Sequence, residues 1–98
     1  MKRKDILNTA LERICGGRDQ VYGKPEDNFK TIANLWFSYL RGKGLLRDGV
    51  YISAADVALM MILFKAGRSA TGKNKEDTWI DIAGYAACGG ELDEQAQI

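Results

Sequence analysis

The chain has 98 residues, a net charge of +1 and no histidine, and 46% of its residues are hydrophobic. This length predicts one domain, and this hydrophobic content excludes a disordered chain. The small net charge argues against electrostatic binding to nucleic acid or membranes, and the missing histidine excludes histidine-based triads, zinc sites and general bases. Any catalysis must therefore rely on carboxylates, lysine, tyrosine or a carboxylate-bound metal ion.

Charge is distributed unevenly along the chain. Residues 1–47 hold ten Lys and Arg against five Asp and Glu, a charge of +5, whereas residues 48–98 hold four against eight, a charge of −4. We expect the two halves to pair with each other or to remain solvated.

Neither the cysteines nor the apolar segments indicate an exported or membrane protein. Cys15 and Cys88 are not part of a Cys-x-x-Cys motif, so we expect buried, unpaired thiols in a reducing, cytoplasmic compartment. The amphipathic start of the chain does not fit a signal peptide. The longest apolar run, residues 57–64, is too short to span a bilayer.

Two helices are predicted in the first half of the chain. The first covers about residues 3–15, where apolar side chains recur at helical spacing, and we expect the glycine pair that follows to end it in the left-handed conformation. The second begins at Pro25, which suits the first turn of a helix because its missing N–H costs nothing there. Its apolar residues recur at i, i+3, i+4 and i+7, and residues 41–44 are predicted to end it.

A third helix is predicted from Ser53 to about Ala70. Ser53 and Asp56 have the spacing of a capping box. Residues 57–64 are apolar on every side, which is typical of a helix that is either central in the fold or shared with a second subunit. Because a four-helix domain of this size has little room to enclose a helix, we expect a subunit interface and hence a homo-oligomer.

A fourth helix is predicted to begin at Asn74, which with Asp77 can cap it, and to end near Cys88, where a Gly-Gly pair follows. The acidic residues 91–98 then form a flexible tail. The sequence therefore predicts a single all-α, four-helix domain over residues 1–90, with a tail after the fourth helix.

Three aspartates are candidates for a metal site. Asp77 and Asp81 are four residues apart and share one face of the fourth helix, and Asp56 begins the third. In the absence of histidine, clustered carboxylates are the ligands of a hard cation such as Mg²⁺. The alternative is that Asp56 is only a cap and that Asp77 only complements a helix dipole. Asp81, between two isoleucines, is the hardest of the three to explain structurally.

Basic residues near the end of the third helix are candidates for phosphate binding. Lys65 and Arg68 follow its apolar part, and Lys75 follows the next turn. Cations at a helix C-terminus also offset the helix dipole, which is the alternative explanation. If they face the acidic fourth helix, they can hold a phosphate chain.

Tyr22 and Asn28 flank the start of the second helix. An aromatic ring and an amide beside a helix N-terminus suit a nucleobase or a sugar. The alternative is an ordinary loop with the usual residues of a helix start.

Three segments of the chain resemble a known family. The patterns YGxPxxNFxxIAxLWxxYL, DVALMMILFKAGR and KEDTWIDIAGYAA are similar to those of small phage and prophage proteins without an assigned function, over about residues 5–88. More distantly, the last segment is similar to the DTLxDIAGYA block of phage nucleotide-modification-associated domains. Those domains resemble the MazG-like, all-α nucleoside triphosphate pyrophosphatases.

The distant resemblance implies a four-helix MazG-like bundle that is an obligate oligomer. Enzymes of that superfamily hold Mg²⁺ with acidic residues on two facing helices and cut between the α- and β-phosphates. Asp77 and Asp81 match the acidic block, and Lys65 and Arg68 match the preceding basic pair. Phe64 departs from the pattern, because the distant relatives carry an acid there, and this argues against hydrolysis.

Three functions follow. In the first, a Mg²⁺-dependent nucleotide pyrophosphohydrolase holds the metal with Asp77, Asp81 and Asp56 or Glu26. In the second, a protein of the host cytoplasm binds a nucleotide or nucleotide-derived molecule without turnover. In the third, a structural or host-interaction phage protein uses these charges only as helix caps and solvated faces. For the first two, the residues expected to contact the nucleotide are Lys65, Arg68, Lys75, Tyr22 and Asn28.

Overall fold

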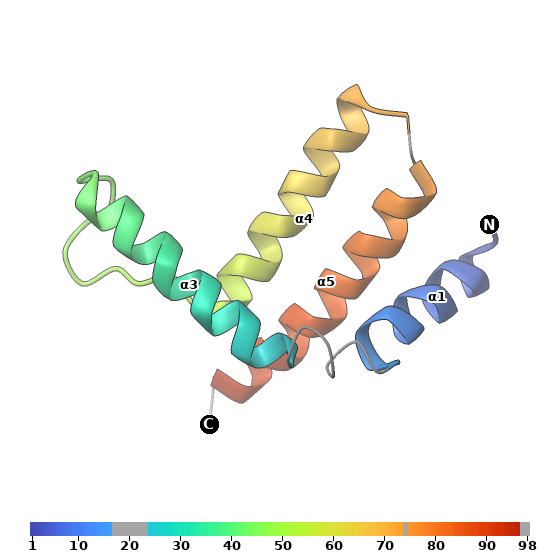
Figure 1. Cartoon of the computed structure of the whole chain (residues 1–98), viewed down its shortest axis with the longest axis horizontal. Helices are drawn as coiled ribbons and strands as arrows, with labels where there is room; N and C mark the ends of the chain where they lie inside the picture. The colour runs from blue at the N-terminus through green and yellow to red at the C-terminus, as the bar shows by residue number, and fades with distance from the viewer. Residues whose placement is uncertain (17–23, 74, 97–98) are drawn as a thin grey trace.

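The computed structural model describes residues 1–16, 24–73 and 75–96. These residues form four α-helices and no strand (Figure 1). The helices are α1 (Arg3–Cys15), α3 (Pro25–Gly42), α4 (Ala54–Thr71) and α5 (Lys75–Ala96). The prediction of an all-α fold with four helices is confirmed.

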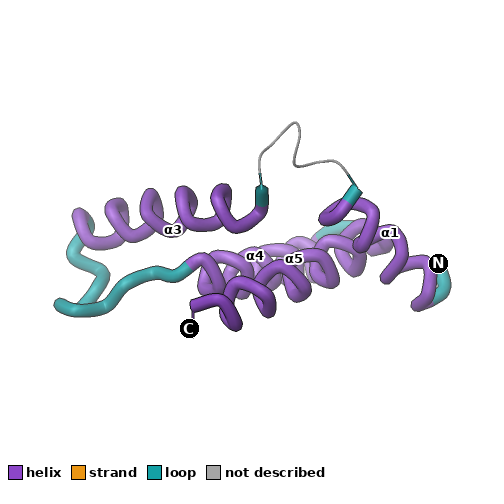
Figure 2. The backbone as a smooth tube through the Cα atoms, turned by 90° about the horizontal axis from the view of Figure 1, so that it is seen from below, coloured by secondary structure: helices purple, strands orange, loops and turns teal. Residues whose placement is uncertain are grey.

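Three of the helices lie in one layer and the fourth crosses it. α4 and α5 run antiparallel and pack along each other, and α1 packs against the other side of α5 (Figure 1). α3 lies over one face of this layer and packs mainly against α4 (Figure 2). α5 is therefore the central helix, and its side chains can meet those of both α1 and α4.

The core of this arrangement is thin. Among the described residues, the buried apolar side chains are Ala10, Ala33, Val57, Ala58, Ile80 and Leu92. Half of them are alanines, and the free energy gained by burial grows with the apolar area removed from water, at about 25 cal/mol per Å². The packing of one chain therefore supplies only modest stabilisation.

Small residues on α5 allow its neighbours to approach closely. A Cβ atom at Gly89 would lie 2.7 Å from the Cβ of Ala58 on α4, and one at Gly84 would lie 3.3 Å from the Cγ2 of Ile14 on α1. Contacts this short leave no room for a larger side chain at Gly89. Gly84 and Gly89 therefore allow α1 and α4 to pack closely against α5.

The predicted end of the fourth helix is wrong. α5 does not stop at Gly89 and Gly90 but continues to Ala96, and Leu92 is only 7% exposed. The positive-φ glycines of the described chain are Gly44 and Gly49, so neither glycine of α5 adopts the left-handed conformation that ends a helix. Residues 91–96 are thus part of the bundle rather than a tail.

The other helix ends agree better with prediction. The capping box is present: the amide of Asp56 donates to Ser53 Oγ at 3.0 Å, and the amide of Ser53 donates to Asp56 Oδ2 at 2.9 Å. Pro25 occupies the first turn of α3. Gly16 ends α1 with φ −95°, which is not the left-handed conformation expected there. The predicted cap Asn74 lies outside the described residues.

None of the helices within the described ranges combines the length and the apolar character needed to cross a bilayer.

Candidate functional site

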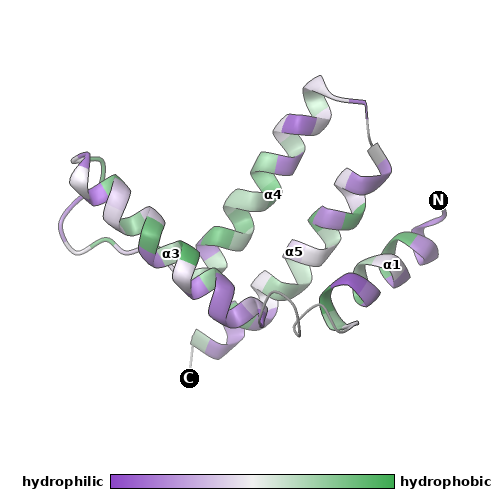
Figure 3. Ribbon diagram, in the orientation of Figure 1, coloured by the Kyte–Doolittle hydropathy of each residue, from purple (hydrophilic) through white to green (hydrophobic). Residues whose placement is uncertain are grey.

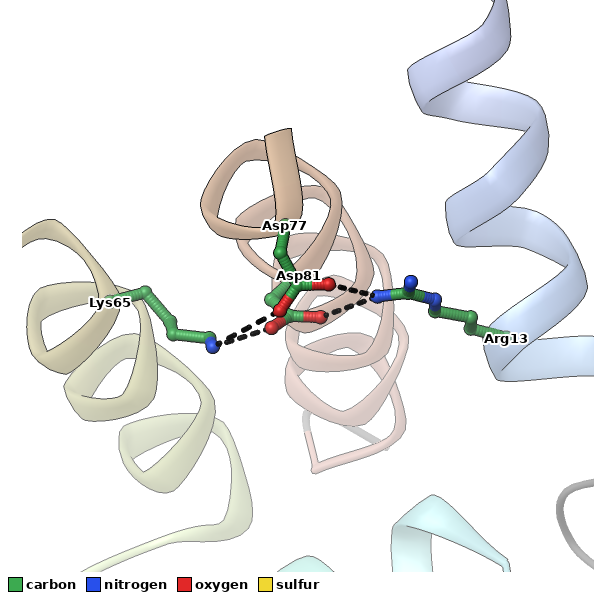
Figure 4. Close-up of polar contacts among 4 residues, drawn as sticks. All are labelled: Arg13, Lys65, Asp77 and Asp81. Atoms are coloured by element: carbon green, nitrogen blue, oxygen red, sulfur yellow. Dashed lines mark hydrogen bonds and ion pairs between the residues drawn. The ribbon is translucent and has the colours of Figure 1, made fainter. Parts of the chain in front are cut away.

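Four charged side chains from three helices meet at α5. Arg13 of α1 and Lys65 of α4 approach Asp77 and Asp81 of α5 from opposite sides (Figure 4). Arg13 Nη1 lies 2.8 Å from Asp77 Oδ1 and 3.2 Å from Asp81 Oδ1. Lys65 Nζ lies 2.5 Å from Asp81 Oδ2 and 4.0 Å from Asp77 Oδ2. We call these four residues the ion-pair cluster.

Helical spacing explains how the cluster forms. Asp77 and Asp81 are one turn apart and therefore point the same way from α5. Ala58 is one of the α4 residues that face α5, and Lys65 follows it by seven residues, so both lie on the same face of α4. Arg13 directly precedes Ile14, which contacts α5 at Gly84. The packing of the helices thus places each charged side chain against α5.

The cluster is electrically balanced and partly shielded from water. Its two positive and two negative charges cancel. The side chains of Lys65 and Asp81 are 18% and 23% exposed, whereas those of Arg13 and Asp77 are about 40% exposed. The hydrogen bond from Arg13 lowers the pKa of Asp77 below its usual value of 3.8, and the same bond raises the pKa of Arg13. Both shifts favour the charged forms, so the Arg13–Asp77 pair is charged at neutral pH.

A pocket opens beside the cluster, between α1, α3 and α5. Its volume is about 500 Å³, within the range of small-molecule sites. Arg13 and Asp81 belong both to the cluster and to the wall of this pocket, and Asn28 and Thr31 add polar groups from α3. The apolar part of the wall includes Ala10, Ile14, Phe29, Ile32, Ile80 and Tyr85. We call this cavity the α1/α3/α5 pocket.

Two aromatic rings form one side of the pocket. Phe29 of α3 and Tyr85 of α5 have ring centroids 6.1 Å apart and an interplanar angle of 33°. Both rings contribute apolar, aromatic surface to the pocket wall. The pocket therefore joins an aromatic, apolar interior to a charged end.

The structure brings together only part of the predicted site. Lys65, Asp77 and Asp81 meet as expected, and Asn28 shares the pocket wall with Asp81. Arg68 is not in the cluster: its guanidinium carbon lies 5.6 Å from the ring centroid of Phe64, which is half exposed.

Two predicted nucleotide contacts fall outside what the structure describes. Tyr22 lies in the segment between α1 and α3 that is not described. The backbone of Lys75 begins α5, but its side chain lies outside the described part of the chain.

The expected three-carboxylate metal site needs correction. Asp56 caps α4 nine residues before Lys65, a rise of about 14 Å along the helix, so it lies apart from Asp77 and Asp81. Glu26 lines a separate cavity with Cys15 and Cys88. In the part of the chain that the structure describes, no three His, Cys, Asp or Glu side chains gather where a metal ion could bind. The carboxylate set consists of two aspartates.

Sequence reasoning missed Arg13. The only sequence signal was indirect, because the first half of the chain carries excess positive charge and the second half excess negative charge. The Arg13 contacts show that the two halves pair at this point.

Comparison with known proteins places the chain in a family. A family model described as a domain of unknown function, DUF6378, matches residues 5–93. The chain belongs to this family. The Gene 55 protein of Mycobacterium phage L5 is 46% identical over 81 residues, which cover 83% of this chain and 47% of that protein. The Gene 55 protein of Mycobacterium phage D29 is 42% identical over 86 residues, covering 87% of this chain and 51% of that protein.

The chain thus spans about half the length of these curated relatives. The predicted similarity to phage proteins of unknown function is confirmed. No solved structure matches the chain. The distant resemblance to MazG-like pyrophosphatases is not shown by these comparisons and stays a prediction.

Proposed function

We propose that this DUF6378 domain binds a nucleotide or a nucleotide-derived phosphorylated molecule, together with Mg²⁺, in the α1/α3/α5 pocket. The observation that carries the proposal is the shared wall: Arg13 and Asp81 are members of the ion-pair cluster and also line an aromatic pocket of about 500 Å³. A ligand with a flat apolar part and a charged part matches such a site.

The apolar end of the pocket suits a nucleobase. Phe29 and Tyr85 offer ring surfaces for stacking, and base–aromatic stacking in nucleic-acid sites contributes about 1–3 kcal/mol per base. Asn28 carries an amide that both donates and accepts hydrogen bonds, as the edge of a base requires.

The charged end suits a metal-bound phosphate group. Mg²⁺ is commonly held by one or two carboxylates while waters and substrate phosphates supply its other ligands, so Asp77 and Asp81 form a sufficient protein donor set. Arg13 and Lys65, which now contact these aspartates, would then contact phosphate oxygens. Because the cluster has no net charge, a phosphate alone gains little attraction from it, and binding should depend on Mg²⁺.

Binding without hydrolysis fits this donor set better than turnover does. In the pyrophosphohydrolase pattern, acidic residues on two facing helices hold the metal ion. Here both aspartates, Asp77 and Asp81, lie on α5. On α4 the position of the expected acid is taken by Phe64, whose ring packs under Arg68. We therefore expect binding, and Mg²⁺-dependent pyrophosphohydrolysis would be detected as release of pyrophosphate.

A thermal-shift titration tests the proposal. The protein is melted with nucleoside and deoxynucleoside triphosphates, each with and without Mg²⁺. A ligand at 100 times its dissociation constant stabilises the fold by about 2.7 kcal/mol, a readable shift in so small a domain. Asp81→Asn should abolish the Mg²⁺-dependent part of the shift while the helical circular dichroism spectrum is retained.

Asp93→Asn is the matched control, because it removes the same charge from an exposed position on the same helix. It should leave the shift unchanged. If no triphosphate gives a Mg²⁺-dependent shift, or if both variants lose it equally, the proposal is wrong and the cluster only joins three helices. Release of pyrophosphate in the same samples would show that the domain hydrolyses the nucleotide rather than only binding it.

A further inference from the structure

One face of α4 is apolar and uncovered. Four large apolar side chains on this face are 42% to 70% exposed: Leu59, Met60, Leu63 and Phe64. By contrast, Val57 and Ala58, at the start of the same apolar run, are buried. In Figure 3 the hydrophobic colour extends along most of α4. At helical spacing these four exposed residues and Gly67 lie on one side of the helix. We call these five residues the outer face of α4.

The chain also exposes more surface than a monomer of its size. Its accessible surface is 7440 Å², whereas a folded monomer of 10.8 kDa has about 5,500 Å². Its Cα radius of gyration is 14.8 Å, against about 13 Å for a compact domain of this length. Obligate homodimer interfaces bury about 2,000–5,000 Å² in total, or about 1,000–2,500 Å² on each copy, and the excess of about 1,900 Å² lies within that range.

We infer that the outer face of α4 is the contact surface for a second copy of this chain, with the two α4 helices antiparallel about a two-fold axis near Leu63. A two-fold contact is self-complementary, so each residue must find a suitable partner on the same helix. Centring the pair on Leu63 brings Leu59 of one copy opposite Gly67 of the other. A Cβ atom at Gly67 would meet nothing within 4 Å, so there is open space to receive that leucine.

The charges near the contact favour the same arrangement. Between Asp56 and Arg68 the outer face carries no charged residue. Association of two copies through this face therefore removes no charged side chain from water and incurs no desolvation penalty for a charge. Asp56 lies at one end of the face and Arg68 at the other, and an antiparallel pair sets unlike charges near each other at both ends. The net charge of +1 per chain opposes association only weakly.

This contact leaves the ion-pair cluster accessible. Lys65 extends from α4 toward α5 and contacts Asp81 there, away from the outer face (Figure 4). Dimerisation and ligand binding therefore use different sides of α4, and the test of one does not depend on the other.

Sedimentation velocity and light scattering of the 98-residue chain test the inference. The wild type should be a dimer at micromolar concentration. Leu63→Lys places a charge at the two-fold axis and should weaken association at least tenfold, while the helical spectrum is retained because Leu63 is exposed in the single chain. The matched control is Leu7→Lys on α1, a leucine of similar exposure (63% against 70% for Leu63) outside this face, which should leave the dimer intact.

Gly67→Phe is a second, independent variant. It fills the space assigned to Leu59 of the other copy, its new Cβ lies within 4 Å of no other helix of its own chain, and it should also weaken association at least tenfold. A wild-type chain that remains monomeric at high micromolar concentration overturns the inference, as expected if a further part of the longer relatives covers α4. Equal dissociation by Leu63→Lys and Leu7→Lys overturns it as well.

Discussion

At the scale of single residues, Arg13 is the side chain that links α1 to the charged residues of α5. It contacts both aspartates of α5 from the side opposite to Lys65, and so it couples α1 to a helix that already packs against α4. Ion pairs as exposed as that of Arg13 and Asp77 are each worth no more than about 1 kcal/mol. Lys65 and Asp81 are more shielded, so removing either leaves a less compensated charge behind.

The lowered pKa of Asp77 predicts a loss of stability in acid. Because the folded-state pKa lies below the usual 3.8, Asp77 stabilises the fold above that value, and the contribution is lost as the pH falls through the folded pKa. The effect should not exceed about 1 kcal/mol, since the side chain is 40% exposed and screened by solvent. Urea unfolding between about pH 5 and pH 2.5 should show a smaller acid loss for Asp77→Asn than for the wild type. An equal loss in both would mean that Arg13 does not stabilise the charged carboxylate.

Gly89 gives a second prediction at this scale. Replacing a helical glycine by alanine ordinarily stabilises a helix by about 0.8–1 kcal/mol. At Gly89 the new Cβ would lie 2.7 Å from the Cβ of Ala58, which cannot rotate away, so Gly89→Ala should destabilise the fold by about 1–3 kcal/mol. Gly90→Ala is the control, since its Cβ meets nothing within 4 Å, and it should stabilise. Chemical denaturation measures both, and two changes of the same sign would contradict this account.

At the scale of elements, α5 organises the molecule. It packs against both α1 and α4, carries both aspartates of the cluster and contributes Tyr85 and Ile80 to the pocket. Its Gly-Gly pair costs helix propensity, but the close approach to α4 and the burial of Leu92 beyond the pair offset that cost. Tertiary packing thus keeps α5 helical through a Gly-Gly pair that, by local sequence rules, would be expected to end the helix.

The last turns of α5 should therefore contribute to stability. Leu92→Ala removes a buried side chain and should cost about 2 kcal/mol, the low end of the range for buried leucines, because the surrounding core is thin. Glu94→Ala changes an exposed residue two positions further on and should be nearly neutral. Thermal and urea unfolding compare the two variants. A neutral Leu92→Ala would show that residues 91–96 do not stabilise the bundle.

At the scale of the whole molecule, one chain is an open arrangement rather than a closed bundle. Its surface and its radius of gyration both exceed those of a typical monomer, and a side of its most apolar helix faces solvent. Both observations have the same cause, because three helices in a layer crossed by a fourth cannot enclose every apolar face.

The inferred dimer predicts a particular response to salt. Salt screens charges but does not weaken apolar contacts. Because the outer face of α4 is uncharged, the dimer dissociation constant should change less than about tenfold between 0.1 M and 1 M NaCl. Sedimentation equilibrium at several salt concentrations measures this. Dissociation at high salt would indicate that charged residues, rather than α4, hold the copies together.

The sequence by itself determined the all-α class, the starts of α3 and α4 and the spacing of Asp77 and Asp81. These features depend on local rules: the period of apolar residues, a proline in the first turn, a capping box and the i, i+4 repeat. Only the tertiary structure decided that Arg13 completes the cluster, that Asp56 and Arg68 lie outside it and that α5 runs through its glycines to Ala96. Each of these depends on which helices approach one another and how closely. Contacts between residues more than sixty positions apart, such as Arg13 and Asp77, leave no periodic signal in the chain.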